Sequence, residues 1–519
     1  MKRTHHQRSV AAAASSRAIL FAGTAAAILT ACLSLDTSKP PSASTSSTSS
    51  SSVGGSGGAG GMGGAGGTGG TATGDVLWGK AFGAQFGDQH ASGVALDPTD
   101  DSIFLVGNYE GQFSFDGLEE LPHSGLEDIY LAKFDATGAA QWAIRSGDQD
   151  AQYVNAVAVS ADRDIFLAGS FQGELTLLNG VKLMSTGGKS DVFAVRLTPE
   201  GVPVWAKGFG DGSTMPKLAT TLAVDSKGNT IIAGYFDGSL EFIPGQPLNA
   251  MGGRDIFLAK LDKDGNTLWS KRLGNGSPGD PPNHLLCRVV VDHLDNIVLE
   301  TAFSGTMSLG APLPDQASPG NRAILLAKFD TNGAPLWQKV FGAAYTEQRS
   351  RALAVDSKNN ILLTGDMAGT VNFGGEPLST SSNSDPDLFV AKFAPNGEHL
   401  WSLRSGSVTS QEGKAIAVDA ADNVIVTGSF LGVLSFGVGE PLVNIQGGYD
   451  LFALKLDPNG AFLWAKQFGD GAAQVTEAMA IDREGNTIFA GSFDGRISFG
   501  ATELSSAGYD DIFVMKLSP

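Results

Sequence analysis

The chain has 519 residues, of which 42% are apolar and 69 are glycine, and its formal net charge at neutral pH is −19. This length and apolar content suffice for a large hydrophobic core, although glycine is about twice as frequent as usual. So acidic a chain repels phosphate backbones, and no basic patch offsets this, which excludes nucleic acid as a partner.

Residues 1–32 predict an export signal. Four basic residues and no acidic one precede the apolar run AILFAGTAAAILTA at 18–31, whose 14 residues are too few to span a bilayer but typical of a signal peptide. The run ends in Leu-Thr-Ala-Cys, which resembles a bacterial lipobox. This resemblance implies that Cys32 is lipidated and becomes the new N-terminus. The alternative is an ordinary secretory signal in which Cys32 occurs by chance.

Residues 33–74 consist mainly of serine and glycine and have almost nothing to bury, so they predict a disordered tether. A flexible chain of this length spans roughly 35 Å on average. Glycine motifs inside it follow from composition alone, because no strand precedes and no helix follows them. Beyond the tether the other cysteine is Cys287, so no internal disulfide is expected.

From Asp75 onward the chain repeats itself. Each period contains an apolar run such as TLAVD (221–225), a second run such as NTIIAGYF (229–236) and a loop of roughly twenty residues. DIFLAKL (255–261) and LWSKRLG (268–274) then follow, joined by a D-x-x-G turn. The tryptophans are spaced by 64, 63, 64, 68, 64 and 63 residues, and they are Trp78, Trp142, Trp205, Trp269, Trp337, Trp401 and Trp464.

These runs have the length and the Val, Ile, Phe and Leu content of β-strands, and no long stretch keeps a helical period. Four short strands in each of seven repeats predict an all-β, seven-bladed propeller of four-stranded antiparallel blades over residues 75–519. Residues 75–83 supply a tryptophan strand with no DIFLAK strand before it. Residues 508–519 supply a DIFLAK-like strand with no tryptophan strand after it. Pairing these two strands closes the ring and leaves no free sheet edge.

The motifs AVD…GN, AGSF, DIFLAK and LWAK resemble the SBBP (seven-bladed β-propeller) repeat family over about residues 75–519. The resemblance implies the fold but no activity. The lipobox and the Ser/Gly tether are also similar to lipoproteins of myxobacteria and related bacteria. A weaker similarity is to pyrroloquinoline-quinone-type propellers, which usually have eight blades.

Most recurring residues have structural explanations. Gly107 and its counterparts indicate close backbone approach, and Ala95 and its counterparts suit the crowded innermost strand. We expect the tryptophans to lie between neighbouring sheets. The Asp and Lys of DIFLAK lie five positions apart on opposite strand faces, so each must bond backbone or a charge elsewhere.

No catalytic constellation, metal site or cofactor site is predicted. Turns such as Asp225–Asn229 could suggest calcium, but they offer too few carboxylates, and Asp and Asn stabilise tight turns unaided. The five histidines beyond the tether do not recur at one repeat position.

The fourth repeat departs most from the others. It has a longer first connection at 273–286, and Val290, Thr301 and Ala323 replace the usual Ala, Gly and Asp. Simple drift of one repeat would also explain these changes. The polar residues that this repeat alone supplies on its two long connections are Asp280, His284, Asp315 and Arg322, which we take as a candidate binding corner.

Two functions remain open. The favoured one is a monomeric, lipid-anchored binding or scaffold module that presents a loop face to a protein or glycan partner, and the alternative is an exported lyase or hydrolase using loop residues near the central channel. Leu33 after the lipobox favours the outer membrane or cell surface of a Gram-negative bacterium, with a periplasm-facing orientation left open. A polar cluster with perturbed carboxylates at the channel mouth would favour the enzyme.

Overall fold

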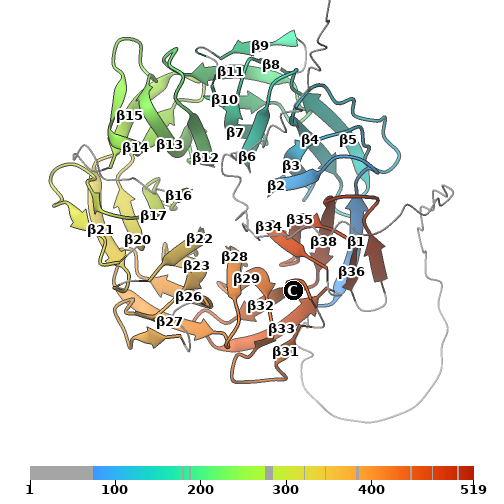
Figure 1. Cartoon of the computed structure of the whole chain (residues 1–519), viewed down its shortest axis with the longest axis vertical. Helices are drawn as coiled ribbons and strands as arrows, with labels where there is room; N and C mark the ends of the chain where they lie inside the picture. Colours follow the sequence, from blue (N-terminus) through green and yellow to red (C-terminus); the bar gives the residue numbers. More distant parts are fainter. Residues whose placement is uncertain are drawn as a thin grey trace, which may run out of the picture.

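The computed structural model describes residues 74–519 except 178–179, 186, 188, 275–284, 321, 345, 381–384, 445–446, 470–471 and 500–501. The leader, Cys32 and most of the tether lie outside the described residues. Within the described part the regular elements are all β-strands, and seven four-stranded antiparallel sheets surround a central axis (Figure 1). The predicted seven-bladed propeller is confirmed.

Each blade is described from its innermost to its outermost strand. Blade one has β2 (Gln89–Leu96), β3 (Ile103–Tyr109), β4 (Asp128–Phe134) and β5 (Ala140–Ser146). Blade two has β6 (Gln152–Val159), β7 (Ile165–Phe171), β10 (Asp191–Leu197) and β11 (Pro203–Phe209). Blade three has β12 (Lys217–Val224), β13 (Thr230–Leu240), β14 (Leu248–Leu261) and β15 (Thr267–Leu273). Blade four has β16 (Leu285–Val291), β17 (Ile297–Phe303), β20 (Ala323–Phe329) and β21 (Pro335–Phe341).

The remaining blades follow the same order. Blade five has β22 (Gln348–Val355), β23 (Ile361–Met367), β26 (Asp387–Phe393) and β27 (His399–Ser405). Blade six has β28 (Gln411–Val418), β29 (Val424–Phe430), β32 (Asp450–Leu456) and β33 (Phe462–Phe468). Blade seven has β34 (Gln474–Ile481), β35 (Thr487–Phe493), β38 (Asp511–Leu517) and β1 (Val76–Phe82).

Blade seven is built from both ends of the repeat region, as predicted. β1 pairs antiparallel with β38, so that Lys80 lies opposite Val514. Backbone and side-chain bonds extend the seam, since Asp75 N donates to Ser518 Oγ (2.9 Å) and Ser518 N donates to the Asp75 carbonyl (2.8 Å). The ring therefore closes through hydrogen bonds between segments more than four hundred residues apart.

The middle strands are apolar on both faces because both faces are covered. All seven residues of β3 and of β7 are buried, whereas the outermost β5 is half-buried along most of its length. Glycine at the centre of the second strand allows close approach: a Cβ on Gly107 would lie 1.8 Å from the His90 carbonyl oxygen of β2. Blade cores thus form between adjacent sheets.

The tryptophan of each blade lies over a turn of the next blade. A Cβ added to Gly460, in the turn between β32 and β33, would lie 2.9 Å from the ring of Trp401 on β27. Trp401 Nε1 donates to the carbonyl of Pro458 in that turn (3.1 Å), and Lys392 Nζ donates to the same oxygen (3.0 Å). Trp205, Trp269 and Trp337 donate in the same way to a carbonyl of the next blade, so indole bonds tie several neighbouring blades together.

The Asp and Lys of DIFLAK have separate partners. Lys392 pairs with Asp356 at the end of the innermost strand of its own blade (2.9 Å), and four other blades repeat this pair. The aspartate lies at the opposite end of the strand, where Asp255 Oδ2 accepts bonds from Met251 N (2.9 Å) and Arg272 Nη1 (2.8 Å). Both residues serve the framework.

The long connection between second and third strands was expected to be a loop, but in five blades it contains a separate short hairpin. These hairpins pair β8 (Glu174–Thr176) with β9 (Lys182–Met184), β18 (Thr306–Met307) with β19 (Gln316–Ala317), β24 (Thr370–Val371) with β25 (Leu378–Ser379), β30 (Val433–Leu434) with β31 (Leu442–Val443) and β36 (Arg496–Phe499) with β37 (Thr502–Ser505). Alternate apolar residues in this connection pack inward.

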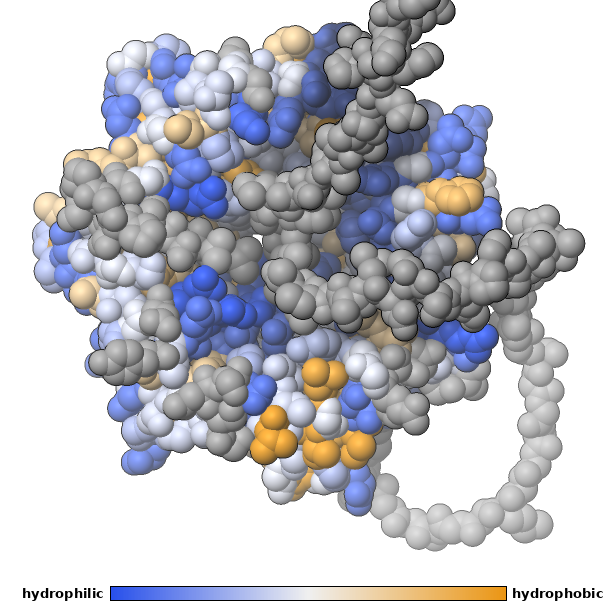
Figure 2. All heavy atoms as spheres, viewed as in Figure 1, coloured by the Kyte–Doolittle hydropathy of each residue, from blue (hydrophilic) through white to orange (hydrophobic). Residues whose placement is uncertain are grey.

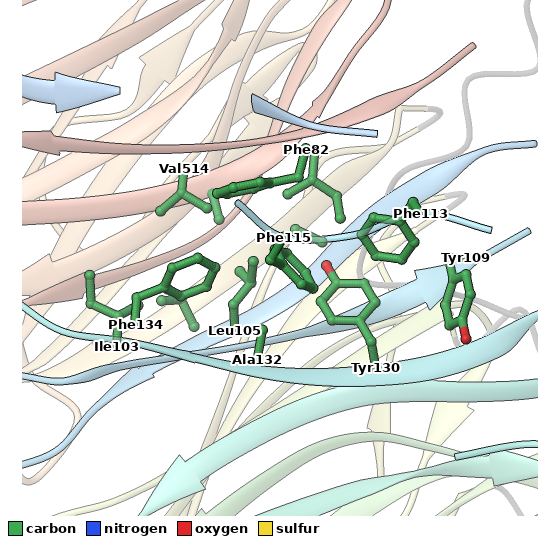
Figure 3. Packing of buried hydrophobic residues seen from close by; sticks show 14 of the residues in the cluster. Phe82, Ile103, Leu105, Tyr109, Phe113, Phe115, Tyr130, Ala132, Phe134 and Val514 are labelled. Carbon is green, nitrogen blue, oxygen red and sulfur yellow. The ribbon is translucent and has the colours of Figure 1, made fainter. Parts of the chain in front are cut away.

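Blade one shows what this connection does. Phe113 and Phe115 lie between β1 of blade seven and β4 of blade one (Figure 3). The ring of Phe115 is 4.9 Å from that of Phe82 and 5.4 Å from that of Tyr130, in geometries favourable for aromatic pairs. The connection therefore seals a groove between blades and is part of the core.

We predict that Trp401→Ala lowers the free energy of unfolding by about 3–5 kcal/mol, because it removes a large side chain from between two blades. Trp401→Phe retains most of the packing but loses the bond to Pro458, so its effect should be about 1–2 kcal/mol. Urea unfolding measures both values. Leu400→Ala is the matched control, since the Leu400 side chain on the same strand is 48% exposed. Equal effects at the two positions would show that the indole does not tie the blades together.

Candidate functional site

Antiparallel blades place their two kinds of connection on opposite faces. The tight turns between first and second and between third and fourth strands define the tight-turn face, and the other connections define the long-connection face. β1 is a fourth strand, and Asp75 just before it bonds Ser518, so the chain enters the propeller on the tight-turn face. The long-connection face lies on the other side.

Two of the four residues of the candidate binding corner lie within the described part of the chain. Asp280 and His284 lie outside the described residues. Asp315 is exposed and follows Pro314, whose carbonyl accepts a bond from Gln338 on the outermost strand β21 (2.5 Å). Arg322 has a half-buried position before β20 and approaches Glu347 at 3.6 Å, at the boundary with blade five. The structure therefore does not bring Asp315 to the inner strands, but it does connect Arg322 to them.

The innermost strand of each blade contains a bulge, and in three blades the bulged side chain contacts the next blade. The bulged residues are Ser92, Asn155, Thr220, Arg351, Lys414 and Glu477, whereas the bulge of blade four falls at Leu286. Bulges re-aim side chains and are common beside functional sites. Asn155 Nδ2 bonds the Ala219 carbonyl of the next blade (2.7 Å), and Thr220 Oγ1 bonds the Cys287 carbonyl (3.0 Å).

The bulged position is neutral in blades one to three and charged in blades five to seven. In blade five, Arg351 Nε lies 2.5 Å from Asp366 Oδ1 and Arg351 Nη2 lies 3.3 Å from Glu412 Oε1 of blade six. Lys414 Nζ in turn lies 2.5 Å from Glu412 Oε2. All four side chains are less than a tenth exposed.

The same network reaches the long-connection face. Arg349 contacts Asp366 at 3.9 Å and Glu347 at 2.7 Å, and Glu347 is the residue that Arg322 approaches. An unbroken series of ion pairs thus runs from Arg322 to Lys414. In Figure 2 strongly hydrophilic atoms gather beside the centre, on the side where β22 lies. We call the set Arg322, Glu347, Arg349, Arg351, Asp366, Glu412 and Lys414 the charge network.

Blade four adds a buried acid and a cation at its innermost pair of strands. Arg288 on β16 lies opposite Glu300 on β17, and Glu300 is fully buried. Burial raises the pKa of Glu300 to about 7, against the opposing effect of Arg288. Burial likewise raises the pKa of Glu477 to about 7, although Lys414, Arg288 and Arg351 act to lower it. Two carboxyl groups near the axis therefore titrate near neutral pH.

Other blades form the same four-stranded sheet without these charges. At the positions that correspond to Arg288 and Glu300, blade three has Thr221 and Ala233, which are cross-strand partners in the same register. Buried ion pairs are weak evidence for stability, since desolvation can exceed their attraction. Charged groups with perturbed pKa in a restricted space are instead candidates for function. We therefore take the charge network with Arg288, Glu300 and Glu477 as the candidate site.

Arg322 was predicted from the sequence, but the other residues of the site were not. A usable signal existed at the fourth position of the innermost strand. This position is neutral in blades one to three but is arginine in QRSRALAVD (348–356) and lysine in QEGKAIAVD (411–419). Aligning the repeats at this position separates charged from neutral blades.

The aspartates of the first turns need no ion to satisfy them. Asp225 Oδ1 accepts the backbone N–H of Asn229 (2.9 Å), and Asp225 Oδ2 accepts Asn229 Nδ2 (2.7 Å) and pairs with Lys260 (2.8 Å). Burial acts to raise the pKa of Asp225, but bonds from Lys260 and Asn229 outweigh it and hold the pKa below its usual value. Over the described ranges, no group of three or more His, Cys, Asp or Glu side chains is placed to hold a metal ion.

Comparison with known proteins gives relatives of unknown or regulatory role. No family model matches the chain. It is 23% identical over 471 residues to an uncharacterized WD repeat-containing protein of Acanthamoeba polyphaga mimivirus, covering 77% of this chain and 34% of that protein. It is 26% identical over 201 residues to the regulatory protein FlaEY of Caulobacter vibrioides, covering 37% of this chain and 20% of that protein. The chain thus spans a third or less of these relatives' lengths.

Similar solved structures are also propellers. They include the Pan2 WD40 domain of Neurospora crassa (12% identity, TM-score 0.40, 83% of this chain and 90% of that chain). The propeller domain of the Trilobed protease from Pyrococcus furiosus is another (10% identity, TM-score 0.39, 83% and 94%). A third is an ulvan polysaccharide lyase (11% identity, TM-score 0.42, 79% and 93%). At these identities the similarity concerns the fold alone. No helix in the described part is long and apolar enough to cross a membrane.

Some carboxyl groups have raised pKa values and others have lowered ones, and together they predict that the fold is most stable at mildly acidic pH. Glu300, Glu477 and Asp511 have raised pKa values, of about 7, about 7 and about 6, because of burial. Burial disfavours their ionised form, so the free energy of unfolding decreases as pH rises from the ordinary carboxyl range through those values. Asp225 and its counterparts have lowered pKa values, so their contribution is lost as pH falls below about 4. We expect the melting temperature to be highest near about pH 5 and lower at about pH 3 and pH 8.

Thermal unfolding followed by circular dichroism measures this profile. Glu300→Gln retains the shape of the side chain without its charge, so the decline between about pH 5 and pH 8 should become shallower in that variant. A decline of unchanged steepness would show that Glu300 does not titrate in this range.

Proposed function

We propose that this chain is a membrane-tethered, extracytoplasmic binding module whose long-connection face receives a protein or glycan partner. The observation that carries the proposal is the position of the charge network, which is confined to adjacent blades and reaches that face at Arg322 and Glu347. A tether that joins the opposite face leaves this face directed away from the anchor at Cys32. Outer-membrane or cell-surface placement and resemblance to SBBP-repeat lipoproteins are part of the same proposal.

The rigidity of the site also supports binding. Buried glutamines at the start of innermost strands hold both long connections: Gln411 Oε1 accepts Ser407 N (3.0 Å), and Gln411 Nε2 donates to the Leu431 carbonyl (2.9 Å). Gln89 forms the same two bonds with Ala84 N and the Glu110 carbonyl. Groups held in this way lose little conformational freedom when a partner binds, which lowers the entropic cost of association.

A second function is favoured by one specific observation. Two carboxyls with pKa values of about 7, Glu300 and Glu477, lie near the cations Arg288 and Lys414, and this combination suits general acid–base chemistry. An exported lyase or hydrolase acting at the channel is therefore the alternative. Its test is turnover of a panel of polysaccharides and peptides by the wild-type chain, with Glu477→Gln as the control. Turnover that is lost in Glu477→Gln would replace the binding proposal.

Partner capture tests the binding proposal. The bait is the full chain carrying Cys32→Ser, which we expect to leave the washed membrane fraction because the lipidation site is removed. The double variant Arg322→Ser, Glu347→Ser is then made in this bait. Serine is the neutral residue at the corresponding positions of other blades, Ser190 and Ser410. Capture of the envelope partner, read by its affinity for the bait, should fall at least about tenfold, as expected when charged contacts are lost.

The matched control changes an ion pair on the other face. Arg483 and Asp101 approach to 2.9 Å on the tight-turn face, and Arg483→Ser with Asp101→Asn should leave capture unchanged. If both double variants capture the partner equally well, the long-connection face is not the binding face. If the Cys32→Ser chain stays in washed membranes, the proposed anchor is wrong.

A further inference from the structure

An open groove lies on the outer rim of blade one. It has a volume of about 430 Å³ and lies between residues 118–122 of the long connection and residues 141–145 of the outermost strand β5. This volume is within the usual range for ligand-binding clefts, about 300–1,000 Å³. Because each wall consists of five consecutive residues, the groove follows the edge of β5 over roughly 17 Å, the length of five extended residues. We call this feature the rim groove.

In blade six a side chain bridges the corresponding space. Val443 N donates to Gln467 Oε1 (3.0 Å), and Gln467 Nε2 donates to the Val443 carbonyl (2.7 Å). Gln467 thus offers strand β31 one donor and one acceptor, as a neighbouring strand would. The hairpin of blade six is therefore fastened to its outermost strand β33.

Blade one has proline and arginine at the two corresponding positions. Pro122 has no N–H to donate, and its carbonyl accepts a bond from the Tyr109 hydroxyl (2.7 Å). Arg145 Nε donates to Asp128 Oδ2 (2.9 Å). The connection of blade one is therefore not fastened to β5 in this way, and the rim groove lies open between them.

One wall of the rim groove is a strand edge. β5 is the last strand of its sheet, so within the described part of the chain no strand pairs with its outer edge. Alternate residues of such an edge direct an N–H and a carbonyl outward. Both walls rest on the aromatic core of Figure 3, because Leu121 belongs to that cluster and Leu118 and Ala143 pack against it. The groove therefore combines backbone donors and acceptors with a fixed apolar base.

The lip of the rim groove carries acidic charge. Glu119 and Glu120 are exposed, and neither takes part in an ion pair among the described residues. The nearby cations have other partners, since Lys80 pairs with Asp116 (3.5 Å) and Arg145 is bound as described above. The whole chain has a net charge of −19, which repels a second copy and attracts a basic segment. Charge complementarity therefore favours a basic occupant.

We propose that the rim groove binds an extended, basic segment of a partner protein, which adds to β5 as a fifth strand. Strand addition supplies main-chain hydrogen bonds, and alternate side chains of the segment supply specificity. Aliphatic side chains suit Leu118 and Leu121 at the base, and lysine or arginine suits Glu119 and Glu120 at the lip. This inference goes beyond the proposed function, because the charge network lies in blades four to six and the rim groove lies in blade one.

The test is fluorescence anisotropy of a labelled Lys-Val-Lys-Val-Lys-Val peptide titrated with the full chain carrying Cys32→Ser. One control peptide has glutamate in place of lysine, and the other is N-methylated at every residue and has no backbone donors. We expect saturable binding of the lysine peptide and affinity at least about tenfold lower for each control. Absence of saturable binding by the lysine peptide, or equal binding of the N-methylated peptide, would overturn the proposal.

Two double variants place the binding in the rim groove. Glu119→Gln with Glu120→Gln should lower affinity at least about tenfold and reduce its dependence on salt. Because both side chains are exposed, the circular dichroism spectrum should not change. Pro122→Val with Arg145→Gln places the bridging pair of blade six in blade one and should abolish binding. The matched control is Glu440→Gln on the hairpin of blade six, which should bind as the unmodified chain does. Unchanged affinity in either double variant would overturn the proposal.

Two further measurements separate this site from other modes of binding. Arg322→Ser with Glu347→Ser should leave the affinity for the lysine peptide unchanged, whereas a loss would show that the peptide binds at the charge network. Maltohexaose should not displace the peptide, whereas displacement would show that the groove takes a glycan. Either contrary result would overturn this inference and leave the proposed binding face to its own test.

Discussion

The pairing of β1 with β38 is the constraint on which the rest of the molecule depends. A propeller blade cannot bury both of its faces alone, so each sheet needs a neighbour on either side. Closure through hydrogen bonds between the two ends of the repeat region supplies blade seven with its outer strand. The same junction places Gly74 beneath Trp464, as Trp401 covers Gly460 elsewhere. Without it the series of ties between blades would end at an exposed edge.

Because those ties recur around the ring, stability is distributed over many equivalent contacts. Lysines paired with turn aspartates, indoles over turn glycines and glutamines beneath the long connections repeat from blade to blade. Single blades can then carry groups that stability does not require. Blades five to seven do so with a charged residue at the bulge of the innermost strand, where blades one to three have Ser92, Asn155 and Thr220. The repeats act as internal controls for one another.

The sequence was informative where one pattern recurs and much less so where partners come from different blades. Seven tryptophans at a constant spacing, and two complementary half-repeats, were enough to predict the blade number and the closing strand pair. The hairpins on the long connections were missed, although Phe113 and Phe115 show the alternation of a strand. Periodicity identifies strands that repeat strictly, and these short segments vary in length between blades.

The site was predictable only in part for a related reason. Arg322 was found because blade four departs visibly from its neighbours, but its link to Lys414 passes through side chains of blades five and six. Such contacts depend on bulges that change the register of the innermost strands, and a bulge has no sure signature in one sequence. The raised pKa of Glu300 likewise follows from burial, which a list of residues does not give.

The central claim is that the charge network is retained for binding and is not needed for folding. It is tested most directly by the free energy of unfolding of one variant that carries Arg351→Asn, Asp366→Ser, Glu412→Val and Lys414→Asn. Each new residue is neutral and occurs at the corresponding position of another blade, as Asn155, Ser170 or Val475. Our account predicts an unfolding free energy equal to or above that of the unmodified chain, since the four buried charges of the network, two acids and two bases, are removed together. A loss of more than about 3 kcal/mol would contradict it and make the network a structural necessity.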